Sequence, residues 1–264
     1  MLGAVVGKWN IFALDLKNEP NGAATWGANN PSTDWNRAAE DMAKTLLGRF
    51  LQWRELIFVE GVSNPTVRSR GRDPNPVWWG GSVEGIWDAP IDLGRQEWME
   101  RVVYSPHVYG PDVYDQGFFW DGGFPNNLPG IWQAHFGFAE GVHGQRAVVL
   151  GEWGGKYGRG PTGARDKVWA DRLGDWMVEN CLGDSFYWCL NPNSGDTGGL
   201  LEDDWRKPMQ PKLGLLRRIQ PTPSLLYCAP EGNVMRVCQS QVPTAVRRGN
   251  DDVRRSESRG TWMR

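Results

Sequence analysis

The segment Ile11–Pro20 reads IFALDLKNEP, a short apolar run that ends in an abrupt polar turn. Ile11–Leu16 is typical of a strand buried on both faces, and the turn that follows carries Asn18 and Glu19. The same pattern, an apolar run ending in turn residues, recurs along the chain. It predicts further strands at Leu56–Glu60, Arg101–Ser105, Ala147–Leu150 and Ser185–Cys189.

Helical patterns alternate with these strands. The predicted helices are Asp34–Gln52, Pro129–Phe138, Asp166–Cys181 and Pro211–Ile219. In the first helix Asp34 is expected at the N-cap. Its buried face is expected to carry residues at four-residue spacing, namely Ala38, Met42, Leu46 and Phe50. Alternating strands and helices predict an α/β fold with a parallel sheet.

The loops after the predicted strands are long and rich in Gly, Asn, Trp and Pro. They cover Asn21–Thr33, Asn64–Gly94 and Gly110–Leu128. In parallel α/β folds the loops that follow the carboxyl ends of the strands build the active site. We therefore expect a functional site where the strand ends meet.

The chain of 264 residues is expected to form one large domain followed by a tail. Residues 1–220 hold the alternating strands and helices. Residues 221–264 contain several Arg and no apolar period, which predicts a disordered tail. A functional basic arm is the alternative.

Charge and hydropathy exclude several kinds of partner. Lys plus Arg number 29 and Asp plus Glu 31, so the net charge of −2 does not favour nucleic acid or an anionic membrane. No apolar run reaches the roughly 18 residues of a transmembrane helix, and Met1–Val6 does not have the features of a secretory signal. The four Cys form no C-x-x-C pair, and their spacing leaves disulfides and free thiols both open.

Tryptophan is unusually frequent, with 16 residues beside 34 Gly and 18 Pro. Some of these side chains are expected to fill the core, but many stand beside Gly, Asn and Pro in predicted loops. An indole ring offers a flat apolar face and a polar edge, which suits the C–H faces of sugar rings. The composition therefore favours an aromatic-walled cleft for a polar ligand.

Polar and aromatic residues stand at the ends of the predicted strands. Glu19 follows the first strand and Glu152 the fourth, while His107 and Tyr109 follow the third and Trp188 lies in the fifth. A lone Glu at a strand end is more often solvated or capping, but two with His and Tyr between them favour a site. Two carboxyls about 5–5.5 Å apart can hydrolyse an acetal, because one donates a proton while the other meets the oxocarbenium-like centre.

These motifs resemble those of glycoside hydrolase family 5. Asn18-Glu19-Pro20 and Gly151-Glu152-Trp153-Gly154 are similar to its acid/base and nucleophile motifs, and the resemblance runs from about Asn10 to Arg217. The other matching segments are LIFVEGV (Leu56–Val62), WWGG (Trp78–Gly81), VYSPHVYGPDVY (Val103–Tyr114), FPNNLPGIW (Phe124–Trp132) and NPNSGDTGGLLEDDW (Asn191–Trp205). The ordered set is most similar to the endo-β-1,4-glucanase branch, the cellulases.

The resemblance implies a (β/α)8 TIM barrel and a retaining double displacement without cofactor or metal. It implies that Glu19 protonates the glycosidic oxygen and then activates water, and that Glu152 attacks the anomeric carbon. Asn18 would bond the 2-hydroxyl of the sugar in the −1 subsite. The implied substrate is a β-glucan polysaccharide or oligosaccharide such as cellulose, with xyloglucan, mixed-linkage glucan and mannan left open.

The resemblance also assigns supporting residues. His107 and Tyr109 match an H-x-Y pair in which the Tyr holds the nucleophile's carboxylate. Trp188 matches the aromatic floor under the −1 sugar, and Trp78 and Trp79 would be further sugar platforms. We expect a monomer with no nucleic-acid or membrane partner. Members of the family are secreted.

In the family the Asn-Glu-Pro motif ends the fourth strand, whereas here it begins at Asn18. We therefore expect the first three or so βα units of the barrel to be missing from this chain. A non-catalytic carbohydrate-binding remnant is the alternative function. Three His without an H-E-x-x-H motif disfavour a metal enzyme, the absence of G-x-S-x-G disfavours a serine hydrolase, and Glu202–Asp204 does not have the alternating ligand pattern of a calcium loop.

Overall fold

The computed structural model describes residues 7–8, 10–64, 77–142 and 146–220, together with the backbone of 226–228 and 234–236. The chain divides into two units, Met1–Ile219 and Gln220–Arg264. In the second unit β7 (Leu226–Cys228) and β8 (Val234–Arg236) pair antiparallel. The rest of the predicted tail, 221–264, lies outside the described residues.

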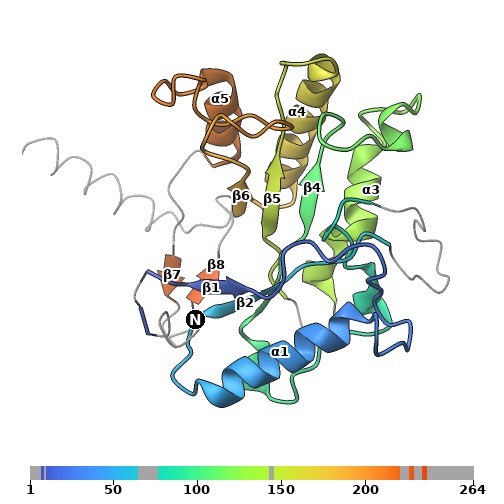
Figure 1. The fold of residues 1–264 in the computed structure, drawn as a ribbon, viewed down its shortest axis with the longest axis vertical. Coiled ribbons are helices and arrows are strands. Elements are labelled where there is room, and N and C mark those ends of the chain that lie inside the picture. Colours follow the sequence, from blue (N-terminus) through green and yellow to red (C-terminus); the bar gives the residue numbers. More distant parts are fainter. Residues whose placement is uncertain are drawn as a thin grey trace, which may run out of the picture. The chain divides into compact units, whose positions relative to one another are not determined.

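The first unit is built on parallel strands. One sheet contains β1 (Ala13–Asp15), β2 (Leu56–Val59) and β3 (Val102–Tyr104), and the other contains β4 (His107–Tyr109), β5 (Leu150–Gly154) and β6 (Ser185–Tyr187). All four strand pairs are parallel. A parallel bridge between Tyr104 and Val148 joins the two sheets, so the strands follow one another in chain order. Figure 1 shows β1 and β2 lying across the view while β4, β5 and β6 stand upright, as expected for a strongly twisted arrangement.

The bounds of all five predicted strands differ from the observed ones, and two of the differences matter for the site. The chain was expected to leave the sheet after Ser105, but after Pro106 it pairs again as β4, with His107 opposite Glu152. Proline has no N–H to donate, so the ladder is interrupted there without ending. The same pairing extends β5 to Gly154, beyond the predicted end at Leu150.

Helices and short 3-10 turns connect the strands. They are α1 (Trp35–Arg49), η2 (Glu84–Trp87), α2 (Gln96–Met99), η3 (Gly117–Phe119), α3 (Leu128–His135), η4 (Gly137–Gly141), α4 (Gly163–Glu179) and α5 (Gln210–Ile219). The helix predicted to reach Phe138 ends at His135, and η4 follows it. Within the described residues, no helix is both long enough and apolar enough to cross a membrane.

The predicted buried face of α1 is right at its C-terminal end, where Leu46 is buried and Phe50 is partly buried, and wrong in the first turns. Ala38 and Met42 are exposed. The buried residues at four-residue spacing begin with Trp35 and continue through Ala39, Ala43 and Leu47. The indole N–H of Trp35 donates to the carbonyl of Glu60 at 2.8 Å, which ties the first turn to the end of β2 and sets the rotation of the helix.

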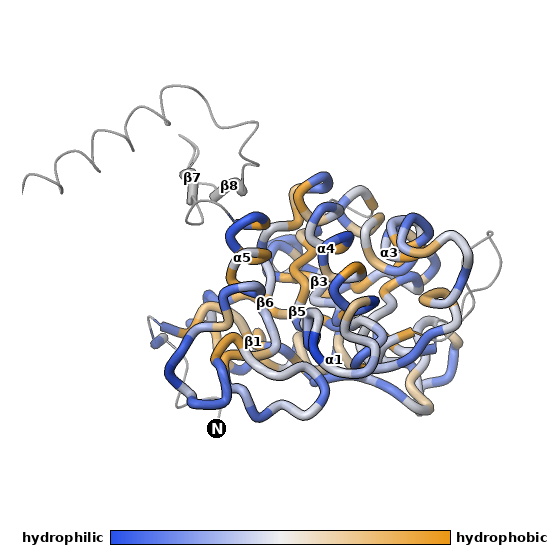
Figure 2. Tube along the Cα trace, turned by 90° about the horizontal axis from the view of Figure 1, so that it is seen from above, coloured by the Kyte–Doolittle hydropathy of each residue, from blue (hydrophilic) through white to orange (hydrophobic). Residues whose placement is uncertain are grey.

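Aromatic side chains fill much of the core. Trp132 on α3 and Trp176 on α4 are both buried, with ring centroids 5.6 Å apart, so they join these two helices. Figure 2 shows hydrophobic segments gathered toward the strands and hydrophilic ones in the loops at the periphery. Other almost inaccessible indoles are Trp26, Trp53, Trp153 and Trp169. Many of the tryptophans are therefore structural.

The loop before α1 is closed by Asp34. This residue occupies the N-cap position, as predicted, but its side chain makes no capping bond to the helix. Its carboxylate accepts hydrogen bonds from the N–H groups of Ala28 (2.9 Å) and Asn30 (3.0 Å) and from the Thr25 hydroxyl (2.7 Å). Burial favours a higher pKa for Asp34, but these hydrogen bonds outweigh it and lower the pKa from its ordinary value of 3.8.

Asp34→Ala should lower the free energy of unfolding by about 1–3 kcal/mol, because it leaves the amides of the loop without their charged acceptor. Urea unfolding followed by tryptophan fluorescence would measure it, with the exposed Asp41→Ala on α1 as the control. Since the folded-state pKa is depressed, the stabilisation is present above pH 3.8 and is lost as the pH falls below it. A difference between the two proteins that did not shrink at low pH would contradict the role of the charge.

Candidate active site

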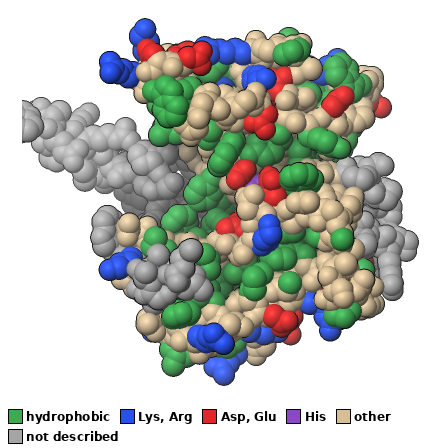
Figure 3. Space-filling model, in the orientation of Figure 1, with side chains coloured by type: hydrophobic (Ala, Val, Ile, Leu, Met, Phe, Trp, Pro, Cys, Tyr) green, Lys and Arg blue, Asp and Glu red, His purple; other side chains and the backbone are tan. Residues whose placement is uncertain are grey.

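A cavity of about 770 Å³ lies at the carboxyl ends of the parallel strands. Asn18 and Glu19 reach it from the turn after β1, Tyr109 from the end of β4, Glu152 from β5 and Trp188 from the turn after β6. Figure 3 shows a hollow with acidic side chains and a histidine at its floor and hydrophobic side chains beside them. The cavity is also lined by Gly22, Ser63, Asn64, Val77, Trp78, Trp79, Val113, Tyr114 and Asp196.

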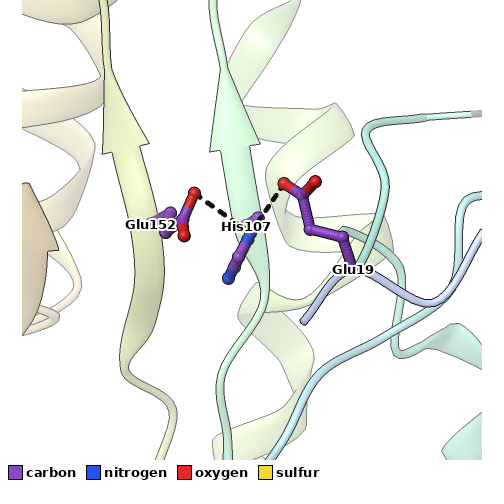
Figure 4. A group of neighbouring side chains, drawn as sticks. All are labelled: Glu19, His107 and Glu152. Carbon is purple, nitrogen blue, oxygen red and sulfur yellow. Dashed lines mark hydrogen bonds and ion pairs between the residues drawn. The ribbon is translucent and has the colours of Figure 1, made fainter. Parts of the chain in front are cut away.

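Glu19 and Glu152 face one another across this cavity. A carboxylate oxygen of each lies within 4.8 Å of the other and of a ring nitrogen of His107. Both carboxylate side chains are 21% exposed, so they are sheltered but reachable. Figure 4 shows them on either side of His107, Glu152 on its strand and Glu19 on its turn. Residues 133 positions apart in the chain thus share one site.

His107 is buried between carboxylates. Its Nδ1 lies 2.9 Å from Glu19 Oε1 and 3.6 Å from Glu152 Oε2, and its Nε2 lies 3.3 Å from Glu60 Oε1. Burial alone favours a lower pKa, but the contacts with Glu19 and Glu60 and the charge of Glu152 outweigh it and raise the pKa of His107 to about 10. At neutral pH this side chain is therefore an imidazolium with both ring nitrogens protonated.

Tyr109 holds the other carboxylate. Its hydroxyl donates a hydrogen bond of 2.6 Å to Glu152 Oε2. Burial, followed by this bond and the negative charge of Glu152, raises the pKa of Tyr109 far above its ordinary value. The phenol therefore stays protonated and remains a donor.

The backbone at Glu19 is left-handed, with φ of 52°. Such a conformation costs a residue with a side chain about 1–3 kcal/mol and needs support from its surroundings. The N–H of Glu19 donates to Glu60 Oε2 at 2.9 Å, and its carbonyl accepts from the side-chain amide of Asn21 at 2.7 Å. The turn is thus held on both sides of the carboxylate that it presents.

The predicted aromatic platforms differ in exposure. Trp188 is 45% exposed and Trp79 57% exposed, so both rings offer a face to the cavity. Trp78 also lines the cavity, but it is only 3% exposed and packs against Phe118, with ring centroids 5.8 Å apart. Trp78 therefore offers little surface to a ligand, and its role as a sugar platform stays a prediction.

Other residues at the site were missed from the sequence. Glu60 was placed at a strand end without a role, yet its carboxylate contacts Glu19 and His107. A single Glu ending the apolar run LIFVE was the signal that could have found it. Tyr114, which is 64% exposed, and Asp196 also line the cavity. Both lie in segments already singled out, but nothing in their spacing distinguishes them from neighbouring loop residues.

In the part of the chain that the structure describes, Glu19, His107 and Glu152 are the one group close enough to surround a metal ion. In this group His107 Nδ1 already contacts both carboxylates, at 2.9 Å from Glu19 Oε1 and 3.6 Å from Glu152 Oε2. The carboxylates favour the protonated imidazole, and a histidine that bound a metal would have to give up that proton.

Comparison with known proteins gives a consistent relationship. The chain matches the family Cellulase (glycosyl hydrolase family 5) over residues 4–194. It is 46% identical over 210 residues to the major extracellular endoglucanase of Xanthomonas campestris pv. campestris, covering 79% of this chain and 40% of the relative. It is 40% identical over 209 residues to an endoglucanase of Paenibacillus polymyxa, covering 79% of this chain and 49% of the relative. The chain thus spans about half the length of these relatives or less.

Solved structures agree with the sequence comparison. The catalytic domain of the Xanthomonas campestris endoglucanase matches with a TM-score of 0.70 and 46% identity, covering 80% of this chain and 57% of that domain. An endocellulase of Pyrococcus horikoshii in complex with cellotetraose matches with a TM-score of 0.72 and 44% identity, covering 80% of this chain and 58% of that one. The family match extends over more than half of the chain, and the described strands share the α/β architecture of these structures. The chain belongs to glycosyl hydrolase family 5, the cellulases.

Proposed function

We propose that this chain carries the active site of a retaining endo-β-1,4-glucanase that cleaves cellulose or a related β-glucan. The observation that carries the proposal is the pair Glu19 and Glu152, with carboxylate oxygens within 4.8 Å of one another in one cavity. Retaining enzymes place their carboxyls about 5–5.5 Å apart, whereas inverting enzymes leave about 6.5–9.5 Å for a water molecule. The close spacing favours retention.

In the first step Glu19 donates its proton to the glycosidic oxygen while Glu152 attacks the anomeric carbon and forms a glycosyl-enzyme. In the second step Glu19 removes a proton from water, which displaces Glu152. Tyr109 fixes the attacking carboxylate through its 2.6 Å hydrogen bond. His107 faces Glu19 at 2.9 Å and stabilises its carboxylate whenever it has given up the proton.

The cavity supplies the sugar subsites. Asn18 stands beside Glu19 and would bond the 2-hydroxyl of the sugar at the cleavage point. Trp188 would lie under that sugar, and Trp79 with Tyr114 would stack on the next ones, since all three present exposed rings to the cavity. A related endocellulase bound to cellotetraose supports an oligosaccharide ligand of this length.

We also propose that the strands β1 to β6 are the last part of a (β/α)8 barrel. Among the described residues β1 and β6 each pair on one side only, as strands at the two ends of an incomplete barrel would. An extracellular relative supports secretion of the enzyme. We expect it to act as a monomer, because a single chain supplies both carboxylates.

A carbohydrate-binding remnant without turnover is the second candidate. A further cavity of about 370 Å³ reaches Glu152 and His107 and is also lined by Phe12, Phe58 and Phe186. Water reaching the pair through this cavity would weaken the electrostatic interactions that the chemistry needs. The platforms would still bind sugars.

A mechanism-based 2-fluoro cellobioside with a good leaving group separates the two candidates. The enzyme should form a stable adduct on Glu152, seen as a mass increase in the intact protein and located by peptide mapping. A folded sample that binds cellotetraose but acquires no adduct would reject the enzymatic proposal and support the binding remnant.

Glu152→Gln should lower kcat by several orders of magnitude while leaving the affinity for cellotetraose within a few fold, because the amide keeps the shape but cannot attack. Reducing-end release and calorimetry would measure the two quantities. The exposed Glu97→Gln on α2 is the control for substitution itself. A variant that kept near-normal turnover would remove Glu152 as the nucleophile.

Glu19→Ala should lower turnover of cello-oligosaccharides by about 10²–10⁴-fold, the usual contribution of general acid catalysis. A dinitrophenyl cellobioside needs no proton on its leaving group, so its first step should be almost unaffected. The second step would be measured from steady-state rates with and without azide. Azide replaces water as the nucleophile and needs no base, so it should raise the rate of Glu19→Ala. Equal losses on both substrates would contradict the acid role of Glu19.

A further inference from the structure

Glu60 is a buried carboxylate at the end of β2 that the proposed reaction does not use. Its side chain is 1% exposed. A charged carboxylate loses its hydration when it is buried, so it needs compensating partners. Oε2 accepts the backbone N–H of Glu19 at 2.9 Å, and Oε1 lies 3.3 Å from His107 Nε2. One carboxylate therefore contacts both the turn that presents Glu19 and the imidazole beside it.

The Glu60 carboxylate fits beside Gly80 because a glycine has no side chain. Gly80 has φ of +69°, and a Cβ built on it would lie 2.1 Å from Glu60 Oε2. The next nearest atoms are also on the Glu60 side chain and on the Glu19 backbone. The Trp78–Gly81 segment thus admits the Glu60 side chain between itself and the catalytic turn.

Among the described residues, the ionisable groups that interact with His107 are acidic. Glu60 comes from β2, Glu19 from the turn after β1, Glu152 from β5 and Asp15 from β1, where its carboxylate accepts from the Ser105 hydroxyl at 3.1 Å. Of these, Glu60 is the one that faces Nε2, on the side of the ring away from Glu19. Its own pKa is raised by burial, which the contacts with His107 oppose.

We propose that Glu60 is a positioning residue that keeps His107 doubly protonated and directs its Nδ1–H toward Glu19, while fixing the backbone of Glu19 through its N–H. A neutral imidazole could turn a lone pair toward Glu19 and repel the carboxylate formed when the acid gives up its proton. With the Glu60 carboxylate 3.3 Å from Nε2, the ion pair keeps the ring charged, and only a donor faces the catalytic pair. The consequence for turnover rests on the proposed function, but the protonation of His107 does not.

Nuclear magnetic resonance of histidine-labelled protein tests the protonation directly. In the wild-type chain both ring nitrogens of His107 should stay protonated at pH 8, in keeping with a pKa of about 10. In Glu60→Gln the pKa of His107 should fall by about one unit or more, a tenfold change in the protonation equilibrium. A wild-type His107 that is neutral at pH 8 would overturn the proposal without any variant.

Matched variants separate charge from structure. Glu60→Asp keeps the charge and should keep His107 protonated, whereas Glu84→Gln removes another buried carboxylate, beside His135, and should leave His107 unchanged. Gly80→Ala tests the same contact without changing Glu60. The added methyl group would push the Glu60 carboxylate away, so the pKa of His107 should also fall. A folded Glu60→Gln or Gly80→Ala whose His107 pKa moves by less than about 0.3 unit contradicts the proposal.

The pH profile of kcat/KM gives the link to catalysis. Glu60→Gln should move its alkaline limb to lower pH, and Glu60→Asp should restore it. If Glu60→Gln lowers the His107 pKa but the wild-type chain forms no fluoroglycoside adduct and shows no turnover, the proposed function is rejected and the positioning role stands. If the wild-type chain is active but Glu60→Gln leaves the His107 pKa unchanged, the positioning role is rejected and the proposed function stands.

Discussion

A single buried positive charge holds this site together. The imidazolium of His107 lies within 3.6 Å of Glu19, Glu60 and Glu152, which come from three different stretches of chain. Carboxylates brought this close repel one another unless a cation or proton lies between them. The turn after β1, the end of β2 and the middle of β5 converge on His107, and a protonated imidazole there reduces the repulsion between their carboxylates.

The register of the β4–β5 pair places the histidine beside the carboxylate. β4 and β5 pair in parallel with His107 opposite Glu152 and Tyr109 opposite Gly154, so the histidine and the tyrosine project beside the Glu152 carboxylate from one short strand. Gly154 adds no side chain next to Tyr109, whose hydroxyl donates to Glu152. The break at Ser105–Pro106 allows β4 to form a separate pairing with β5 after β3 has paired with β2.

Around this charged centre the protein places two kinds of tryptophan. Trp153, next to Glu152, is fully buried and packs edge-on against Tyr187, with ring centroids 4.9 Å apart, so it anchors the strand that carries Glu152. Trp188, next to Tyr187, is 45% exposed and faces the cavity. The neighbours Tyr187 and Trp188 thus differ in role, one packed against Trp153 and the other lining the cavity, because successive side chains along an extended chain point to opposite faces.

The sequence by itself determined the alternation of strands and helices and the location of Asn18 and Glu19 in the turn after β1, because apolar runs and the turn residues that end them are local signals. The pairing that makes a strand of His107–Tyr109 and places Glu152 inside β5 was decided by the tertiary structure. Only the tertiary structure decided which face of α1 is buried, which of two adjacent indoles is open, and that Glu60 contacts the site. Those outcomes depend on groups distant in sequence: the carbonyl of Glu60 that binds the Trp35 indole, and the His107 imidazole that the Glu60 carboxylate contacts. No local pattern records such a partner, since a contact of this kind exists only once the strands lie side by side.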